Sequence, residues 1–184
     1  MPTKLDELYL EGDHFVVRDL YRSDLNKTYL GWLNDIEITQ HLGWEEGIYS
    51  MEKLVSYYEG QSESTYQNFA IIDKEKDKHI GNLTFNPINI RHNHTGLGGI
   101  IGDKDYWGKS GAFVEGMRLL IEYGFKVRKF KKIYSGVTVL NVPCIIASKK
   151  TGFIEEGYLK EHHLYPDGKY VDAIAFGQIN PYLD

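Results

Sequence analysis

The stretch Gly99-Ile-Ile-Gly-Asp-Lys-Asp-Tyr-Trp-Gly-Lys-Ser-Gly-Ala-Phe113 is the most informative part of this 184-residue chain. Its apolar start, Ile100-Ile101, predicts a strand that ends at Gly102. A loop rich in small residues follows, and from Phe113 apolar residues recur at the spacing of a helix that runs to about Lys126. A loop whose N–H groups converge before a helix N-terminus is suited to hold phosphate. The segment therefore predicts a ligand that carries phosphate.

One interpretation of this loop is a P-loop, in which Lys109 and Ser110 would complete the pattern Gly-x-x-x-x-Gly-Lys-[Ser/Thr]. The first glycine of that pattern falls on Asp103, and Gly102 is one residue too early. A P-loop also usually follows the first strand of a domain, whereas this loop follows roughly the fourth. A small P-loop kinase is therefore the less favoured alternative.

The remaining hydrophobic patterns predict an α/β fold of the mixed, α+β-like kind, with helices on the faces of one sheet. Besides the strand that ends at Gly102, strands are expected at 14–20, 66–73, 79–85, 132–140, 154–160 and 170–179. Besides the helix after the loop, helices are expected at 23–34 (capped by Ser23), at 51–61 (capped by Ser50), and from Asn141 to a stop at Gly152. With no linker or repeat in the chain, residues 1–184 are expected to form a single domain.

Composition narrows the class of partner. A formal net charge of −5 argues against non-specific nucleic-acid binding. The single cysteine, Cys144, excludes an intrachain disulfide and fits a reducing compartment. No apolar run approaches the roughly 20 residues of a membrane helix, and none resembles a signal peptide. We therefore expect a cytoplasmic protein, a monomer or homodimer, with neither nucleic acid nor membrane as its partner.

Three stretches carry a family resemblance: Ile100 to Lys109, Asn141 to Phe153 with its final Gly-Phe, and Trp32-Leu-Asn-Asp-Ile-Glu37. Together they resemble the GNAT superfamily of N-acetyltransferases over about residues 14–179. The chain is most similar to the branch that includes the ribosomal-protein alanine N-acetyltransferases. That branch also includes acetyltransferases that act on amino sugars in surface-polysaccharide pathways.

This resemblance implies the GNAT fold and acetyl-CoA as co-substrate. The central sheet would be mixed and mostly antiparallel, with the strand that ends at Gly102 splayed from the strand at 132–140. The pantetheine arm would contact the exposed backbone of the first of these strands and Asn141, and the pyrophosphate would lie on the loop. The cofactor-binding residues that the resemblance implies are Ile100, Ile101, Gly102, Trp107, Gly108, Lys109, Ser110, Gly111, Ala112 and Asn141.

Three positions depart from the family pattern. Ser110 stands where the loop usually has glycine, so Gly111 is the alternative residue for a positive φ. Gly96 stands where a carboxylate often precedes the Leu-Gly of the strand. Ser148 stands where a tyrosine often protonates the leaving thiolate, and a serine hydroxyl is too weak an acid to replace it directly. Without these groups, we expect catalysis to depend on positioning of the amine and on a base that acts through water, more than on one strong general acid.

The candidate catalytic residues are Ser148, which could hold a water or the sulfur, and the possible bases His94 and Glu37, with His92 and Asp35 as further candidates. Trp32, Asn34 and Glu37 are expected to shape the acceptor side. The pairs His92/His94 and His162/His163 lack a third ligand at a recognisable spacing, so no metal site is expected.

The sequence thus predicts transfer of an acetyl group from acetyl-CoA to a primary amine that attacks the thioester directly. The amine would belong to the amino sugar of a nucleotide sugar or to a protein N-terminus. A GNAT-like module that binds acyl-CoA without catalysis is the alternative, motivated by Ser148 and Gly96.

Overall fold

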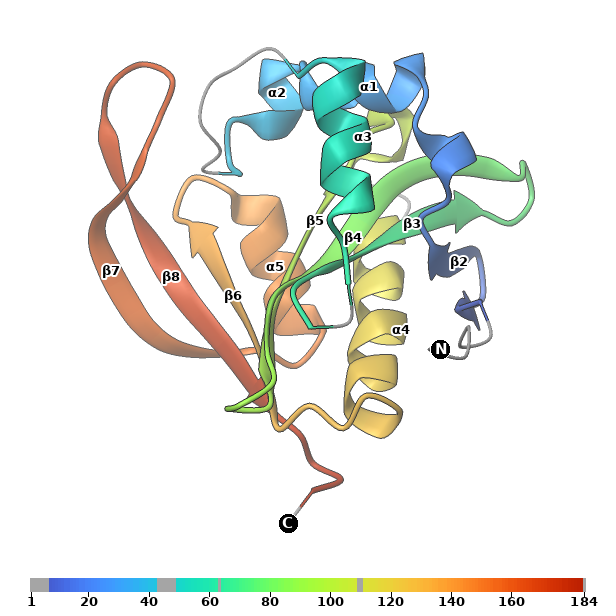
Figure 1. The fold of residues 1–184 in the computed structure, drawn as a ribbon. Coiled ribbons are helices and arrows are strands. Elements are labelled where there is room, and N and C mark those ends of the chain that lie inside the picture. Colours follow the sequence, from blue (N-terminus) through green and yellow to red (C-terminus); the bar gives the residue numbers. More distant parts are fainter. Residues whose placement is uncertain (1–6, 43–48, 63, 109–110, 184) are drawn as a thin grey trace.

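The computed structural model describes residues 7–42, 49–62, 64–108 and 111–183. Its centre is an eight-stranded sheet in the order β1-β2-β3-β4-β5-β6-β8-β7 (Figure 1). Every neighbouring pair is antiparallel except β5 and β6, which are parallel. The strands are β1 Tyr9–Glu11, β2 Phe15–Asp19, β3 Gln67–Asp73, β4 Lys78–Asn89, β5 His94–Ile101, β6 Lys132–Thr138, β7 Ile154–Leu164 and β8 Tyr170–Ile179.

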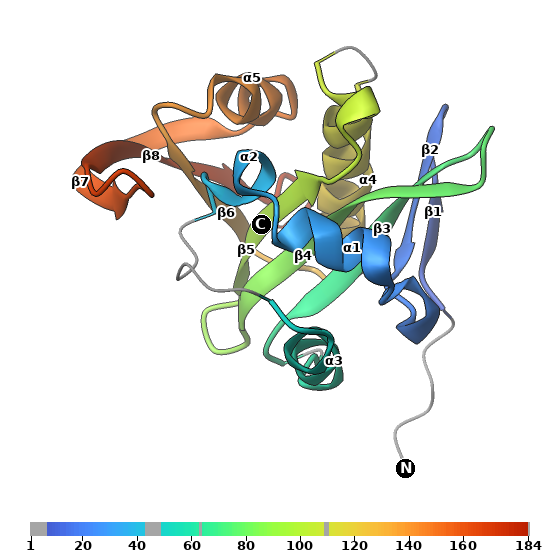
Figure 2. The same cartoon turned by 90° about the horizontal axis from the view of Figure 1, so that it is seen from above.

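Helices cover both faces of the sheet (Figure 2). One face carries α1 (Lys27–Leu33), α2 (Ile36–Thr39) and α3 (Met51–Glu59), which pack with Val16, Ala70 and Ile100 in one apolar cluster. The other face carries α4 (Ala112–Lys126) and α5 (Val142–Lys150), which pack in a second and larger cluster. A mixed, mostly antiparallel sheet with helices on both faces is the predicted fold class, which is confirmed.

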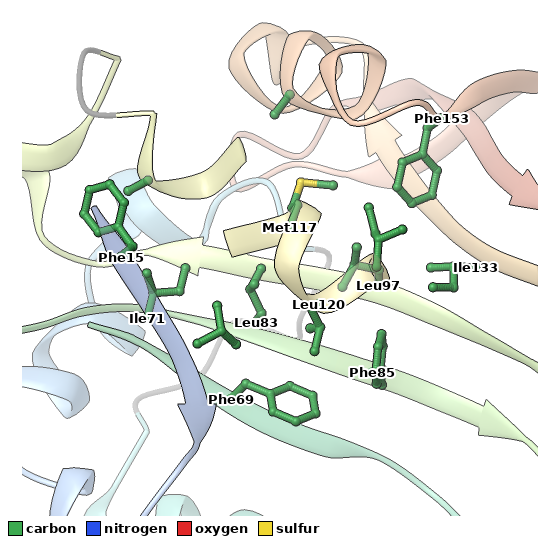
Figure 3. Packing of buried hydrophobic residues seen from close by; sticks show 14 of the residues in the cluster. Phe15, Phe69, Ile71, Leu83, Phe85, Leu97, Met117, Leu120, Ile133 and Phe153 are labelled. Atoms are coloured by element: carbon green, nitrogen blue, oxygen red, sulfur yellow. The ribbon is translucent and has the colours of Figure 1, made fainter. Parts of the chain in front are cut away.

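The larger cluster explains the position of α4. Leu120 of this helix lies beside Leu83 and Phe85 of β4, and Met117 belongs to the same buried cluster (Figure 3). Leu120 and Phe85 are completely buried. Residues three or four apart on a helix share a face, whereas alternate residues share a face of a strand. These two periods together hold the N-terminus of α4 beside the end of β5.

The sheet divides at its parallel pair. β5 and β6 are paired at only three positions, from His94 opposite Lys132 to Gly96 opposite Tyr134. Beyond Gly96 the two strands separate, while β5 stays paired with β4 as far as Ile101. The predicted splay is therefore present, and it leaves one edge of β5 without a neighbouring strand.

The prediction of a helix that starts at Ser23 and runs to Asn34 is wrong. A short 3₁₀ turn spans Arg22–Asp24, and α1 begins at Lys27 with Asn26 as its cap. The Asp24 carboxylate accepts hydrogen bonds from Arg18 and from the backbone N–H of Tyr21, which fixes a separate turn before the helix. The short elements β1 and α2 were not predicted, because three or four residues carry no measurable period.

The other helix limits agree with their local signals. Ser50 caps α3 and Asn141 caps α5, each through its side-chain oxygen. Gly152, which was predicted to end α5, has a φ of +92°. β4 is longer than expected, so Pro87 lies inside this strand and not in a loop.

Candidate functional site

A cleft of about 600 Å³ opens where β5 and β6 separate. Its walls come from four places: the end of β5, the loop with the first turn of α4, the first turns of α5, and residues 37–42 in and after α2. Eight of the sequence-predicted site residues line it, namely Glu37, Ile100, Ile101, Trp107, Gly108, Gly111, Ala112 and Asn141.

The described residues on either side of this loop before α4, Gly108 and Gly111, have features that an anion-binding loop needs. Gly108 and Gly111 have φ values of +76° and +71°, in the left-handed region that glycine adopts without strain. Gly111 is the N-cap of the 15-residue helix α4, whose N-terminal end carries a partial positive charge. The positive φ at Gly111 matches the alternative in which this residue replaces the missing loop glycine. Lys109 and Ser110 lie outside the described residues.

Two aromatic side chains fasten this loop to the sheet. The indole N–H of Trp107 donates to the Ile101 carbonyl at 2.8 Å, and the Tyr106 hydroxyl donates to the Asp73 carboxylate. The bond from Tyr106 lowers the pKa of Asp73, so this carboxylate stays charged. Trp107 is 41% exposed, so its ring forms part of the wall of the cleft as well as an anchor. The position of the phosphate-type loop is thus set by the end of β5 and by β3.

The predicted strand residues have different roles. Gly99, Ile100 and Ile101 all line the cleft, although the side chain of Ile100 is buried in the apolar cluster of the opposite face. Gly102 is buried against Trp32, and a Cβ at position 102 would lie only 1.9 Å from the Trp32 ring. Neither Gly102 nor Trp32 is among the described residues that line the cleft. Their contact holds the end of β5 against α1, on the face of the sheet that carries α1, α2 and α3.

Asn141 has the geometry for two roles. Its Oδ1 accepts a hydrogen bond from the Cys144 N–H at 3.2 Å, which is the helix cap. Its Nδ2 makes no hydrogen bond to any described residue, and Asn141 lines the cleft. The capping bond fixes the amide plane through Oδ1, so the Nδ2 donors are not used by the cap.

Ser148 lies behind the wall of the cleft. It is completely buried, and its Oγ makes no hydrogen bond of normal geometry to a described residue, although it lies near Cys144. Cys144 itself lines the cleft. Burial raises the pKa of this thiol to about 11, an effect that the Ser148 hydroxyl partly opposes. The thiol is therefore protonated at neutral pH and a poor nucleophile.

The predicted acceptor side is only partly assembled at the cleft. Glu37 lines it and forms an ion pair with Lys104, whose Nζ also lies 2.6 Å from Asp35. The Asn34 side chain bonds the backbone of Leu30 and of Tyr49, so it connects α1 to the chain before α3. Asn34 is absent from the described lining residues, and its visible role is structural.

His94 stands at the paired end of β5, where its ring stacks on His92 and contacts the edge of Tyr134. The described lining of the cleft includes neither histidine.

A carboxylate at position 96 is excluded by geometry, because a Cβ there would lie 2.3 Å from the Asn86 carbonyl oxygen. The irregular register of β4 between Phe85 and Ile88 thus occupies the space that a side chain at 96 would need.

Three residues that the sequence analysis did not select meet at the acceptor side. His41, just after α2, lines the cleft, and its Nδ1 is hydrogen-bonded to the hydroxyl of Tyr165. The same hydroxyl lies 2.8 Å from Oγ1 of Thr138 at the end of β6. Burial, and next the neighbouring His163, lower the pKa of His41, so its imidazole is neutral at pH 7. No local motif marks these residues.

Among the described residues, no three His, Cys, Asp or Glu side chains are placed to share a metal ion. None of the helices in the described part of the chain is long and apolar enough to cross a membrane.

Comparison with known proteins identifies the family to which this architecture corresponds. The model of the acetyltransferase (GNAT) domain matches residues 14–154. An uncharacterized N-acetyltransferase, p20, of Bacillus licheniformis is 32% identical over 118 residues, which span 64% of this chain and 62% of that protein. The probable N-acetyltransferase YjcK of Bacillus subtilis is 26% identical over 130 residues, 71% of each chain.

Solved structures agree with this assignment at the level of the fold. The spermidine N-acetyltransferase of Vibrio cholerae, in complex with CoA and spermine, has a TM-score of 0.82 at 24% identity. The match covers 92% of this chain and 97% of that one. The ribosomal-protein-S5-alanine acetyltransferase of Vibrio fischeri has a TM-score of 0.77 at 22% identity, with 96% and 99% covered.

Proposed function

The chain belongs to the GNAT acetyltransferase family, and on this premise we propose that it acetylates the α-amine of a polypeptide N-terminus with acetyl-CoA as donor. The observation that carries the proposal is the cleft between β5 and β6, which joins an anion cradle to an acceptor wall of low net charge.

The cradle fits the two ends of coenzyme A. Gly108, Gly111 and the first turn of α4 offer N–H groups and a positive helix end to the pyrophosphate. The edge of β5 that faces away from β4, together with Asn141, offers backbone and amide groups to the pantetheine arm. Lys150 also lines the cleft, as the one lysine among the described lining residues, and adds positive charge there.

The chemistry needs few protein groups. The neutral amine nitrogen attacks the thioester carbonyl carbon, and a backbone N–H at the edge of β5 stabilises the oxyanion that forms. The carbon–sulfur bond then breaks, and a thiol with a pKa of about 8.5 is a good enough leaving group to depart as thiolate. The absence of a tyrosine at position 148 is therefore compatible with turnover. Positioning of the amine becomes the main task of the acceptor wall.

The charge of the lining favours a peptide terminus over the other amines. Among the described lining residues, Glu37 is the only carboxylate and Lys150 the only lysine or arginine. Glu37 is already paired with Lys104, so a polyamine would find no unpaired carboxylate on the described wall. The described acceptor wall, residues 37–42, contains no lysine or arginine to meet the diphosphate of a nucleotide sugar. An α-amine, with a pKa of about 8, also needs less help to lose its proton than a lysine-type amine.

The test is release of free thiol from acetyl-CoA in the presence of single acceptors. We expect turnover with a short peptide that begins with an unblocked alanine, and none with the same peptide acetylated at its N-terminus. Spermidine and a uridine-diphosphate amino sugar complete the panel. Faster turnover of either one overturns the choice of acceptor. Binding of acetyl-CoA with no thiol release on any acceptor overturns the enzymatic proposal in favour of a non-catalytic module.

A further inference from the structure

A three-residue network crosses the acceptor side of the cleft. It joins His41 after α2, Tyr165 in the turn between β7 and β8, and Thr138 at the end of β6. Tyr165 and Thr138 are buried, and His41 is half-buried and lines the cleft. His41 and Tyr165 are 124 positions apart in the chain, so the fold itself creates this contact.

The turn that supplies Tyr165 is well fixed. Its backbone N–H donates to the Lys169 carbonyl at 2.9 Å, and its carbonyl accepts from the N–H of Gly168 at 2.8 Å. Gly168 has a φ of +80°, which closes the turn at a position where glycine is unstrained. The Tyr165 hydroxyl is therefore held at one place relative to the His41 ring. An aromatic ring kept rigid in this way orients its partner at little entropic cost.

The hydrogen bonds of this network allow two proton arrangements, and one of them gives His41 the tautomer of a base. When the Tyr165 O–H donates to Thr138 Oγ1, the phenol oxygen accepts the Nδ1–H of the imidazole. The neutral ring then has its lone pair on Nε2, which makes no hydrogen bond to any described residue. An imidazole whose Nδ1–H is held by a neighbour and whose Nε2 is open has the arrangement of a general base.

We propose that Nε2 of His41 removes the proton from the acceptor ammonium, and that Tyr165 is the positioning residue that holds His41 in the competent tautomer. This inference rests on the proposed acetyl transfer and names a base for it. One proton of the ammonium passes to Nε2 and later to solvent. The nitrogen lone pair forms the carbon–nitrogen bond, the carbon–sulfur bond breaks to release the thiolate of coenzyme A, and a second proton of the nitrogen is lost to solvent.

The surroundings of His41 are compatible with this role. His163 and Tyr165 face it from the β7–β8 hairpin, Thr138 from β6, and Glu37 shares the lining of the cleft. Burial and His163 lower the pKa of His41, and burial and His162 lower the pKa of His163. A neutral imidazole at pH 7 is ready to accept a proton. An α-ammonium, whose pKa is about 8, loses its proton to such a base more readily than a lysine ammonium, whose pKa is about 10.4.

The experiment measures kcat/KM for the peptide acceptor between pH 5 and 9.5 in the wild type, His41→Gln and Tyr165→Phe. His14→Gln is the matched control, because His14 is exposed just before β2 and is not among the described lining residues of the cleft. In the wild type the rate should rise through the pKa of His41, below 6.5. In His41→Gln only the free amine reacts, so the rise should move to the pKa of the amine, near 8.

At pH 7 we expect His41→Gln to be roughly 100-fold slower, within the usual range of general-base assistance. About tenfold of this loss should be recovered at pH 9.5, because the neutral fraction of the amine rises from about a tenth to nearly all of it. Tyr165→Phe should be about tenfold slower, with its rise moved to lower pH, because the imidazolium loses a hydrogen bond. A His41→Gln variant with the wild-type pH profile overturns the inference, as does an equal loss at every pH. A wild type inactive on every amine overturns the proposed function instead, and the inference falls with it.

Discussion

At Gly111 one backbone torsion sets the direction in which α4 begins. Its φ is +71°, and a Cβ built there would have no heavy atom within 4 Å. The requirement for glycine is therefore one of conformation and not of space. An alanine at this position would either adopt a left-handed backbone, at a cost of about 1–2 kcal/mol, or rotate the first amides of α4 away from the cleft.

We therefore expect Gly111→Ala to lower the free energy of unfolding by about 1–2 kcal/mol and to weaken acetyl-CoA binding. Gly31→Ala is the matched control, because Gly31 lies within α1 and its Cβ would also meet nothing within 4 Å. That change should leave stability equal or higher by about 0.5–1 kcal/mol. Urea unfolding and a thermal shift with acetyl-CoA measure both effects. Unchanged binding in Gly111→Ala would remove this loop from the phosphate site.

At the level of elements, α5 depends on a side chain that both caps the helix and faces the cleft. Asn141→Asp retains the oxygen that accepts from the Cys144 N–H and adds a negative charge that the helix N-terminus favours. It removes the Nδ2 donors. We expect this variant to keep its stability and to lose affinity for acetyl-CoA, whereas Asn141→Ala should lose both, with a stability cost of about 1 kcal/mol.

Asn26 offers the control for this pair of variants. It caps α1 by accepting from the N–H groups of Thr28 and Tyr29, and it is not among the described lining residues of the cleft. Asn26→Ala should cost about 1 kcal/mol of stability with no change in acetyl-CoA affinity. Denaturant unfolding and calorimetric titration separate the two roles. If Asn141→Asp binds acetyl-CoA as tightly as the wild type, the role of Asn141 is capping alone.

For the whole molecule, a partly buried imidazole makes stability depend on pH. His79 packs between Trp32 and Tyr29, and its Nε2 lies 3.0 Å from the Gly81 carbonyl oxygen. Burial is the largest influence and lowers the pKa of His79, although Asp24 opposes it. A histidine with a lowered pKa binds fewer protons in the folded state than in the unfolded one. Its contribution to stability is therefore complete above the unfolded pKa of about 6.5 and decreases as the pH falls below it.

We expect the free energy of unfolding to decrease between pH 7 and pH 5, by at most about 1.4 kcal/mol per pH unit for each such group. His79→Gln should reduce this slope whatever its effect on stability at pH 7, and His14→Gln, at an exposed position, should not. Urea unfolding at half-unit steps of pH measures the slopes. A His79→Gln slope equal to that of the wild type would assign the pH dependence to other groups.

The features that the sequence predicted are those that depend on neighbours in the chain. The caps at Ser50 and Asn141 need only an N–H three residues away, so a short window contains the whole signal. The cap at Ser23 failed because Arg18 and Asp24 fix a separate turn there. The partnership of His41 with Tyr165 and the clash between a Cβ at Gly96 and Asn86 exist only once the strands are paired.

The pairing of β5 with β6 at only three positions also affects how the molecule unfolds. On one side of it stand β1 to β5, and on the other β6, β8 and β7, which are joined to each other along much longer registers. A co-substrate that contacts β5 on one side and α5 on the other would bridge the two parts of the sheet. We therefore expect saturation with acetyl-CoA to slow amide hydrogen exchange in β6 and β8, which contribute no residue to the described lining of the cleft. Saturation should also make unfolding of the two halves more cooperative.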